Sequence, residues 1–167
     1  MRWFVMRVKL SRYCVRVFMA AIFVAASILL SACSKPVLKT SNNHLVSISS
    51  LKGKWVFINY WASWCVHCRK EVPELNKFYQ DHRDKVVVLG INYDGLVNPQ
   101  LASAVHRFGI TFPVLATNPW KMFHLNEVNV VPTTFVLNPQ GHLVYKLLGP
   151  QTESGLEALM NTSSQNA

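Results

Sequence analysis

The stretch that most restricts the fold is residues 54–61, KWVFINYW, which is rich in valine, isoleucine and aromatic residues. Such a stretch is typical of a strand buried inside a sheet. Residues 85–94, KVVVLGINYD, contain a valine run that suits a second central strand covered on both faces. The first strand leads directly into Cys65 and Cys68, three positions apart, and then into a segment with helical character.

The remaining elements follow from periodicity and from turn residues. The helix after the first strand has Val66, Leu75, Phe78 and Tyr79 on its apolar side. Together the elements predict an α/β fold, with a mostly parallel sheet completed by an antiparallel hairpin and with helices on both faces. The other expected elements are a helix over 98–108 capped by Asn98, a strand in 110–117, a short helix in 119–128, a hairpin in 130–149 turning at 138–141, and a last helix from Thr152 to Met160 with Thr152 as its cap.

The N-terminal segment has the order of an export signal. Residues 1–16 contain five basic residues and no acid, and an apolar run over 17–30 follows. The run ends in LLSAC, which resembles a bacterial lipoprotein signal in which Cys33 becomes the lipidated N-terminus. An uncleaved membrane anchor and ordinary cleavage are the alternatives. Each of them delivers the domain across the inner membrane, so we expect a periplasmic location.

The sequence divides into three parts: residues 1–32 as the signal or anchor, 33–43 as a polar tether, and 44–162 as one domain. Without residues 1–32 there are twelve basic and eight acidic residues, and the net charge falls from +9 to +4. The remaining basic residues are dispersed along the chain. This pattern argues against a nucleic-acid partner.

Cys65 and Cys68 are the two cysteines that fall within the expected domain. A bridge that closes so short a loop removes little entropy from the unfolded chain, so chemistry explains the pair better than stability does. A cysteine at an exposed corner between a strand and a helix has a thiol pKa below the free value of about 8.5, which describes Cys65. Cys65 can attack a substrate disulfide, and Cys68, one turn deeper, can resolve the mixed disulfide.

A CxxC pair has three other common uses. Haem attachment requires a histidine after the second cysteine, but residue 69 is arginine. Structural zinc requires two further ligands, and the histidines lack ligand spacing. A copper carrier that uses the two thiolates stays open on spacing alone. We expect no bound metal and no cofactor beyond the redox-active cysteine pair.

The segment NYWASWCVHCRKEVPEL (59–75) resembles the active-site segment of the TlpA/ResA/DsbE group of thioredoxin-like proteins, whose pattern is W-A-x-W-C-x-x-C-x-x-E-x-P. The resemblance extends through TFPVL and VVPTTFVLNPQGHLVYKLLG and covers about residues 44–160. It implies a thioredoxin fold, a central mixed sheet flanked by helices, with a TlpA-like strand and helix inserted around 86–112. The implied activity is dithiol–disulfide exchange.

The same resemblance assigns roles to single residues. Pro132 matches the cis-proline that faces the cysteine pair, and it leaves the backbone of Val131 free to bind an extended substrate. Glu71 matches an acidic residue near the pair that relays a proton or tunes the thiol pKa. Asn59 replaces the buried aspartate of thioredoxins proper. Trp64 and Trp61 are candidates for shaping the groove around Cys65, with Trp61 more typical of the core.

His67, between the cysteines, leaves the direction of exchange open. A protonated histidine there stabilises the Cys65 thiolate and favours an oxidant of the DsbA kind, whereas an exposed histidine without a role leaves a reductase. The expected function is a membrane-anchored reductase of exported proteins, with apocytochrome c as one implied substrate and a DsbD-type membrane protein as its reductant. A DsbA-like oxidant or isomerase and a copper-binding chaperone are the alternatives.

Overall fold

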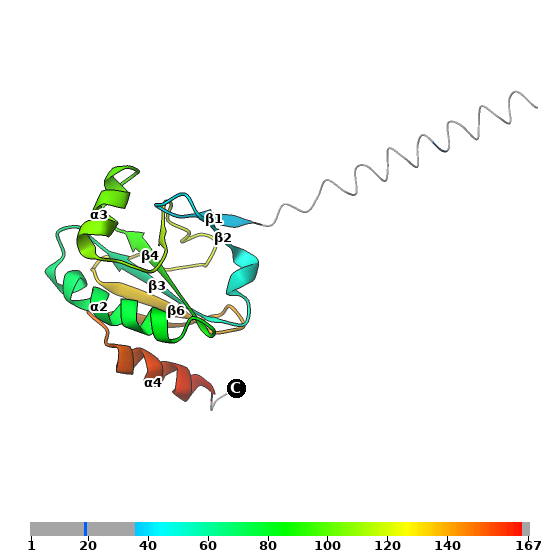
Figure 1. Ribbon diagram of the computed structural model, residues 1–167. Helices are drawn as coiled ribbons and strands as arrows, with labels where there is room; N and C mark the ends of the chain where they lie inside the picture. The colour runs from blue at the N-terminus through cyan, green and yellow to red at the C-terminus, as the bar shows by residue number, and fades with distance from the viewer. Residues whose placement is uncertain (1–18, 20–35, 165–167) are drawn as a thin grey trace, which may run out of the picture. The chain divides into compact units, whose positions relative to one another are not determined.

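The computed structural model describes Met19 and residues 36–164, and Figure 1 shows the arrangement of the elements from 36 onwards. The rest of the expected signal segment 1–32, and Cys33 with it, lies outside the described residues. Within the described part, no helix combines the length and the apolar character that a membrane crossing requires. Residues 36–164 belong to one folded unit.

A five-stranded mixed sheet forms the centre of this unit, with the strand order β5-β4-β3-β6-β7. The strands β3, β4 and β5 run parallel to one another, and β6 and β7 add an antiparallel hairpin. Every residue of β3 is buried, as expected for the middle strand. The α/β class and this topology are confirmed. The bounds are β3 (Trp55–Trp61), β4 (Val86–Asn92), β5 (Val114–Leu115), β6 (Thr133–Leu137) and β7 (Leu143–Leu148).

Within residues 36–164 the α-helices α2 (Val66–Asp81), α3 (Gln100–Phe108) and α4 (Glu153–Ser164) share one core cluster with the β3 side chains that alternate from Trp55 to Trp61. Figure 1 shows α2 in front of the sheet and α4 beside α2, below it in this view. The opposite face is covered by a small hairpin, by the 3-10 helix η1 (Ile48–Leu51) and by the loop 116–132. Helices therefore lie on both faces, as expected, but within residues 36–164 the opposite face carries the 3-10 helix η1 and no α-helix.

The short helix expected over 119–128 is replaced by turns. Leu125 N donates to the carbonyl of Trp120 at 2.9 Å. His124 has a φ of 51°, a left-handed conformation that no regular α-helix continues. The segment therefore stays a loop, and it covers its face of the sheet with the buried side chain of Leu125.

Residues 37–47 form a hairpin where the sequence predicted a tether ending at residue 43. The strand β1 (Val37–Lys39) pairs with β2 (Leu45–Ser47), and Thr40 bridges to Leu115 at the sheet edge. In β1 a single inward residue alternates with two exposed ones, which is too short a pattern to predict a strand. The folded unit therefore begins at Pro36 rather than near His44.

Of the two predicted helix caps, one is confirmed and one is wrong. Thr152 Oγ1 accepts a hydrogen bond from Gly155 N at 3.2 Å, which confirms it as the cap of α4. Asn98 is not a cap, because α3 starts at Gln100 and the Asn98 side chain donates to the carbonyl of Ser41 at 2.8 Å. That bond ties the start of α3 to the loop between β1 and β2.

Gly90 allows close packing between β4 and its neighbours. A Cβ there would lie 2.9 Å from Val114 Cγ2, 3.1 Å from Phe112 Cε2 and 3.4 Å from Trp61 Nε1. We expect Gly90→Ala to lower the free energy of unfolding by about 1–3 kcal/mol through overpacking, as measured by urea denaturation. In a Val114→Ala background the same change should cost less, because the nearest atom is gone. An equal cost in both backgrounds would contradict the packing explanation.

Candidate active site

Cys65 and Cys68 lie where β3 has ended and α2 begins. They form a disulfide with a Cα–Cα distance of 5.3 Å, within the range expected from their spacing. Cys65 is the N-cap of α2, and its Sγ accepts a hydrogen bond from Cys68 N at 3.0 Å. The free N–H groups and the positive end of the helix stabilise a thiolate at this position.

The two cysteines differ in access to solvent. Cys65 is 5% exposed and Cys68 is 0% exposed. The corner that holds Cys65 is therefore less open than the sequence suggested. Cys65 is still the more accessible sulfur, as the order of attack requires.

Pro132 lies opposite the cysteine pair. The Val131–Pro132 peptide bond is cis, which confirms the conformation that the resemblance implies. The carbonyl oxygen of Val131 lies 3.8 Å from Cys65 Sγ. Among residues 36–164, no hydrogen bond joins the main chain of Val131 to another main-chain group, because β6 begins only at Thr133. An extended peptide whose cysteine reacts with Cys65 can pair with this free edge.

Glu71 is buried in a polar network one turn after Cys68. Its Oε2 accepts from Asn59 Nδ2 at 3.0 Å, and its Oε1 accepts from Gln151 N at 3.0 Å. Asn59 Nδ2 also donates to Thr134 Oγ1 at 2.9 Å. Burial raises the pKa of Glu71 to about 7, although the bonds from Gln151 and Asn59 oppose the rise. This carboxyl can therefore gain or lose a proton near neutral pH.

Asp94 holds the segment that precedes Cys65, and sequence reasoning missed it. Its Oδ2 accepts from the main-chain N and the Oγ of Ser63, both at 2.7 Å, and its Oδ1 accepts from Trp64 Nε1 at 2.8 Å. Partial desolvation opposes ionisation, but the hydrogen bonds from Ser63, Asn92 and Trp64 outweigh it and lower the pKa of Asp94 below its usual range. The sequence could have indicated this contact through the topology. Because β3 and β4 are adjacent parallel strands, the loop after β3, which holds Ser63 and Trp64, and the loop after β4, which holds Asp94, meet at one edge of the sheet.

The aromatic and histidine candidates fall into two groups. Trp61 is fully buried and packs against Phe108 with ring centroids 4.8 Å apart, so it belongs to the core. Trp64 is 66% exposed and stands beside Cys65, held by Asp94. His67 is exposed on α2, and so is Val66, which the sequence had placed on the apolar side of the helix. In the first turn of α2, these two side chains therefore face solvent, whereas Cys68 faces the core.

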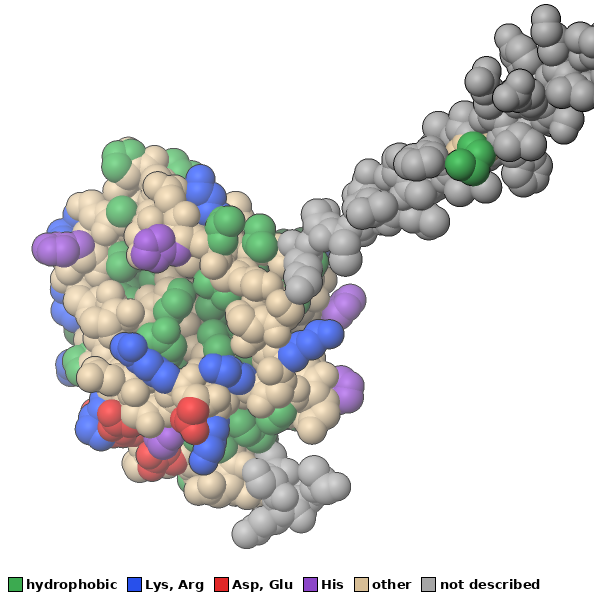
Figure 2. All heavy atoms as spheres, turned by 45° about the vertical axis from the view of Figure 1, so that its right-hand side comes forward, with side chains coloured by type: hydrophobic (Ala, Val, Ile, Leu, Met, Phe, Trp, Pro, Cys, Tyr) green, Lys and Arg blue, Asp and Glu red, His purple; other side chains and the backbone are tan. Residues whose placement is uncertain are grey.

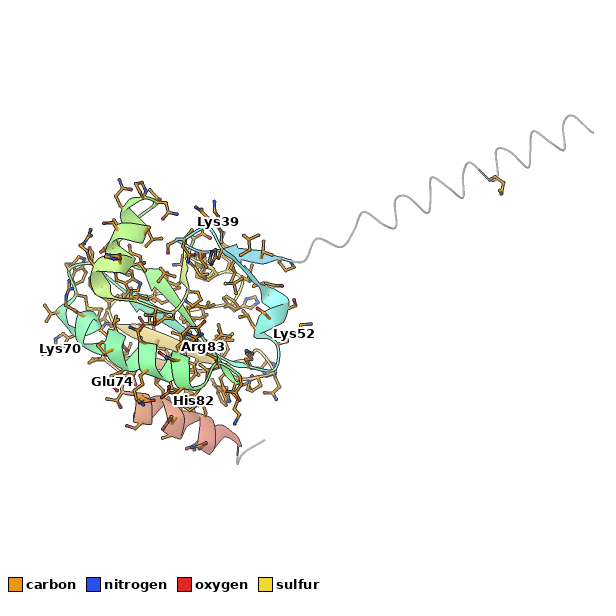
Figure 3. The ribbon with its side chains drawn as sticks, in the orientation of Figure 1. Lys39, Lys52, Lys70, Glu74, His82 and Arg83 are labelled. Atoms are coloured by element: carbon orange, nitrogen blue, oxygen red, sulfur yellow. A yellow bond between two sulfur atoms is a disulfide. The ribbon has the colours of Figure 1, made fainter. Side chains whose placement is uncertain are left out.

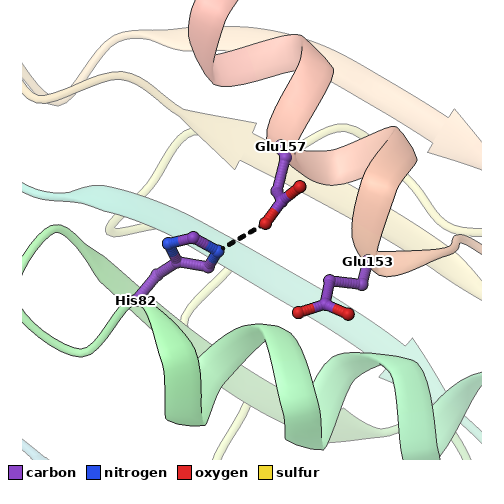
Figure 4. Close-up of side chains that lie close together, drawn as sticks. All are labelled: His82, Glu153 and Glu157. Atoms are coloured by element: carbon purple, nitrogen blue, oxygen red, sulfur yellow. Dashed lines mark hydrogen bonds and ion pairs between the residues drawn. The ribbon is translucent and has the colours of Figure 1, made fainter.

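A second polar cluster joins α2 to α4, away from the cysteines. His82, Glu153 and Glu157 have ligand atoms within 4.8 Å of one another, and His82 Nε2 lies 2.8 Å from Glu157 Oε1 (Figure 4). Lys77 Nζ lies 2.8 and 2.7 Å from the two oxygens of Glu153 and so compensates that carboxylate. The acidic side chains visible in Figure 2 gather in one small group beside a histidine. These side-chain contacts hold α2 and α4 together, and we call the group of Lys77, His82, Glu153 and Glu157 the clamp.

Glu74 adds to the same clamp. Its Oε2 accepts from the main-chain N of Glu153 at 3.0 Å, at the start of α4. Figure 3 shows Glu74 and His82 along the side of α2 that faces α4. Because Gln151, just before α4, binds Glu71, the clamp also fixes the residue that contacts the buried carboxyl.

Comparison with known proteins identifies the family. Residues 32–146 match the model of the AhpC/TSA family. The chain is 34% identical over 130 residues to the thiol-disulfide oxidoreductase ResA of Bacillus subtilis, which covers 75% of this chain and 70% of that protein. It is also 30% identical over 122 residues to the thioredoxin-like protein YneN of Bacillus subtilis, over 72% of this chain and 71% of that protein.

Solved structures agree with the fold. StoA from Bacillus subtilis matches with a TM-score of 0.60 at 27% identity, over 75% of this chain and 95% of that chain. A DsbF homologue from Corynebacterium diphtheriae matches with a TM-score of 0.65 at 27% identity, over 77% of this chain and 84% of that chain. The family match over residues 32–146 includes the cysteine pair, the buried glutamate and the cis-proline.

Proposed function

Because this chain belongs to the AhpC/TSA family and is a thiol–disulfide oxidoreductase with a thioredoxin-like fold, we propose that it reduces disulfide bonds in exported proteins. One observation carries the proposal. Cys65 caps α2 with its sulfur 3.8 Å from the carbonyl of Val131, next to the cis-proline. A reactive sulfur beside an unpaired stretch of backbone suits a polypeptide substrate better than a small disulfide.

The reaction starts from the reduced pair. The Cys65 thiolate attacks one sulfur of the substrate disulfide, and the other substrate sulfur leaves as a thiolate. The Cys68 thiolate then attacks Cys65 Sγ and releases the second substrate sulfur. The substrate gains two electrons, and Cys65 and Cys68 end as the disulfide. Glu71, three residues after Cys68 on α2 and equally buried, takes the proton that Cys68 loses.

The protein acts on the periplasmic side of a bacterial membrane. The basic and then apolar order of residues 1–32, followed by Cys33, supports export and a lipid anchor. A membrane thiol reductant of the DsbD type returns Cys65 and Cys68 to the dithiol form. Apocytochrome c, whose haem-site cysteines must be reduced, is one substrate of the proposed class.

The redox potential tests the direction of exchange. Equilibration of the full chain with glutathione or dithiothreitol buffers should give a potential near that of thioredoxin, about −270 mV. A value near −120 mV would instead support a DsbA-like oxidant, in which His67 stabilises the Cys65 thiolate. Stoichiometric Cu(I) that survives competition by a chelator would support the copper-carrier alternative.

Trapping tests the substrate class. Cys68→Ala removes the resolving thiol, so mixed disulfides on Cys65 should accumulate and can be identified after denaturing purification. The variant with both Cys65→Ala and Cys68→Ala is the matched control, because it lacks both thiols. Capture of exported proteins with paired cysteines is the expected result. Capture no greater than in the control would count against a polypeptide substrate.

A further inference from the structure

A cavity of about 540 Å³ opens on the face of the sheet opposite α2. Its lining includes three aromatic side chains, Tyr60, Tyr93 and Trp120, and two aliphatic ones, Leu125 and Val128. Its volume falls within the range of about 300–1,000 Å³ that is usual for ligand pockets. Tyr93 and Trp120 are 46% and 50% exposed, so their ring surfaces remain available to an occupant.

The walls of this cavity are fixed by hydrogen bonds. Tyr60 Oη donates to Asn118 Oδ1 at 2.7 Å, and Trp120 N donates to the same oxygen at 3.2 Å. Leu96 N donates to Asn92 Oδ1 at 3.0 Å, which holds the turn after β4. Burial raises the pKa of Tyr60 to about 12, against the opposing bond to Asn118, so the phenol stays protonated and bonded. A cavity with fixed walls binds without the cost of ordering them.

Short stretches of chain connect the lining of this cavity to the residues around Cys65. Tyr93 and Gly95 flank Asp94, which binds Ser63 and Trp64 immediately before Cys65. On the other side, the segment containing Val128 leads directly to the Val131–Pro132 bond. Tyr60 itself is paired in register with Thr133, the residue after that proline.

The exposed large apolar side chains also concentrate at this end of the sheet. Trp64 and Val66 lie just after β3, and Tyr93 and Val97 follow β4. Trp120, Met122 and Val130 lie on the loop before β6. Exposed apolar surface gathered beside a reactive group marks a contact surface for another molecule.

We propose that this cavity is a specificity pocket that takes a large apolar or aromatic side chain of the polypeptide substrate, close in sequence to its reactive cysteine. While the substrate backbone pairs with Val131, the neighbouring side chain inserts between Tyr93 and Trp120. The proposal rests on the proposed reduction of polypeptide disulfides. It adds a preference for one kind of residue near the cysteine.

Peptide disulfides test this preference. Each peptide of the series has one internal disulfide. One residue, within three positions of a cysteine on either side, is varied among Phe, Leu, Ala and Asp. With the full chain in detergent, at least one position should give about tenfold higher kcat/KM for Phe or Leu than for Ala. Trp120→Ala and Tyr93→Ala should each reduce that ratio below about threefold, mainly through KM.

Leu45→Ala is the matched control, because Leu45 is 64% exposed and apolar but lies outside this cavity. It should leave the ratio unchanged. A wild-type protein without any positional preference, or variants that keep the full preference, would overturn the pocket assignment. The same series separates the two proposals. If the wild type reduces none of the peptides, the proposed function fails. If it reduces all of them with equal kcat/KM, only the pocket fails.

Discussion

Replacing Cys65 with Ser is expected to lower the turnover of a peptide disulfide by about 10³-fold or more, because the attacking thiolate is lost. Cys68→Ser should block turnover as well, but it should leave the first attack intact. In a single-turnover experiment the Cys68→Ser protein still forms a mixed disulfide, and the Cys65→Ser protein does not. The difference follows from the position of Cys65 at the N-cap of α2 and from the complete burial of Cys68.

Both variants are best made in a background with Cys14→Ser and Cys33→Ser, so that the N-terminal cysteines do not contribute. Mass spectrometry of the acid-quenched reaction identifies the adduct and its position. An adduct on Cys68 in the Cys65→Ser protein, at the wild-type rate, would reverse the assigned order of attack. Equal rates of first attack in both variants would show that the helix N-terminus does not favour either sulfur.

Some parts of this site could be predicted from the sequence because their residues lie within a few positions of one another. The strand, the cysteine spacing and the start of α2 are consecutive, so periodicity and spacing predicted them together. The cis bond at Pro132 was predictable only through the resemblance, because the chain itself carries no signal that separates it from a trans bond.

The parts that were missed depend on contacts between distant segments. Asp94 binds Trp64 from thirty positions away, and Asn118 binds Tyr60 from fifty-eight. A single aspartate or asparagine in a loop gives no pattern from which such a partner can be inferred. The helix expected over 119–128 is absent for a related reason, since Asn118 holds the start of a loop from which Leu125 packs against the sheet.

The hairpin β1–β2 shows the limit of periodicity. Leu38 is buried, but the strand that carries it is three residues long. Polar residues such as Lys39 and Asn42 dominate the composition of this stretch, and a tether has the same composition. Thr40 of the hairpin pairs with Leu115 of the edge strand β5. This is a contact between distant segments, so the local sequence of the hairpin does not predict it.

The second large effect is expected for Glu71→Gln, which should slow turnover at pH 8 by about 100-fold. In the wild type the carboxyl has a pKa of about 7, so its base form predominates at pH 8 and can accept the proton of Cys68. Wild-type turnover should therefore rise as pH increases through 7. A glutamine cannot take up this proton, so that rise should be absent in the variant.

The same substitution should also change how stability depends on pH. The pKa of Glu71 is about 7 in the folded protein against an ordinary 4.5, so between these values the folded state binds more protons than the unfolded state. The contribution of Glu71 to stability is therefore fully present below about pH 4.5 and is lost as pH rises through 7, by about 3 kcal/mol in total. Glu71→Gln, which carries no charge, should lose this dependence.

The glutamine keeps the bond from Gln151 N, which its Oε1 can accept. Its Nε2 takes the place of the oxygen that accepts from Asn59 Nδ2, so that one bond is lost. Urea denaturation at pH 5 and pH 8 measures the effect, with exposed Asp84→Asn as the control that should follow the wild type. If Glu71→Gln kept the wild-type fall in stability between these pH values, the buried carboxyl would not be the group that titrates, and the proton transfer assigned to it would have to come from elsewhere.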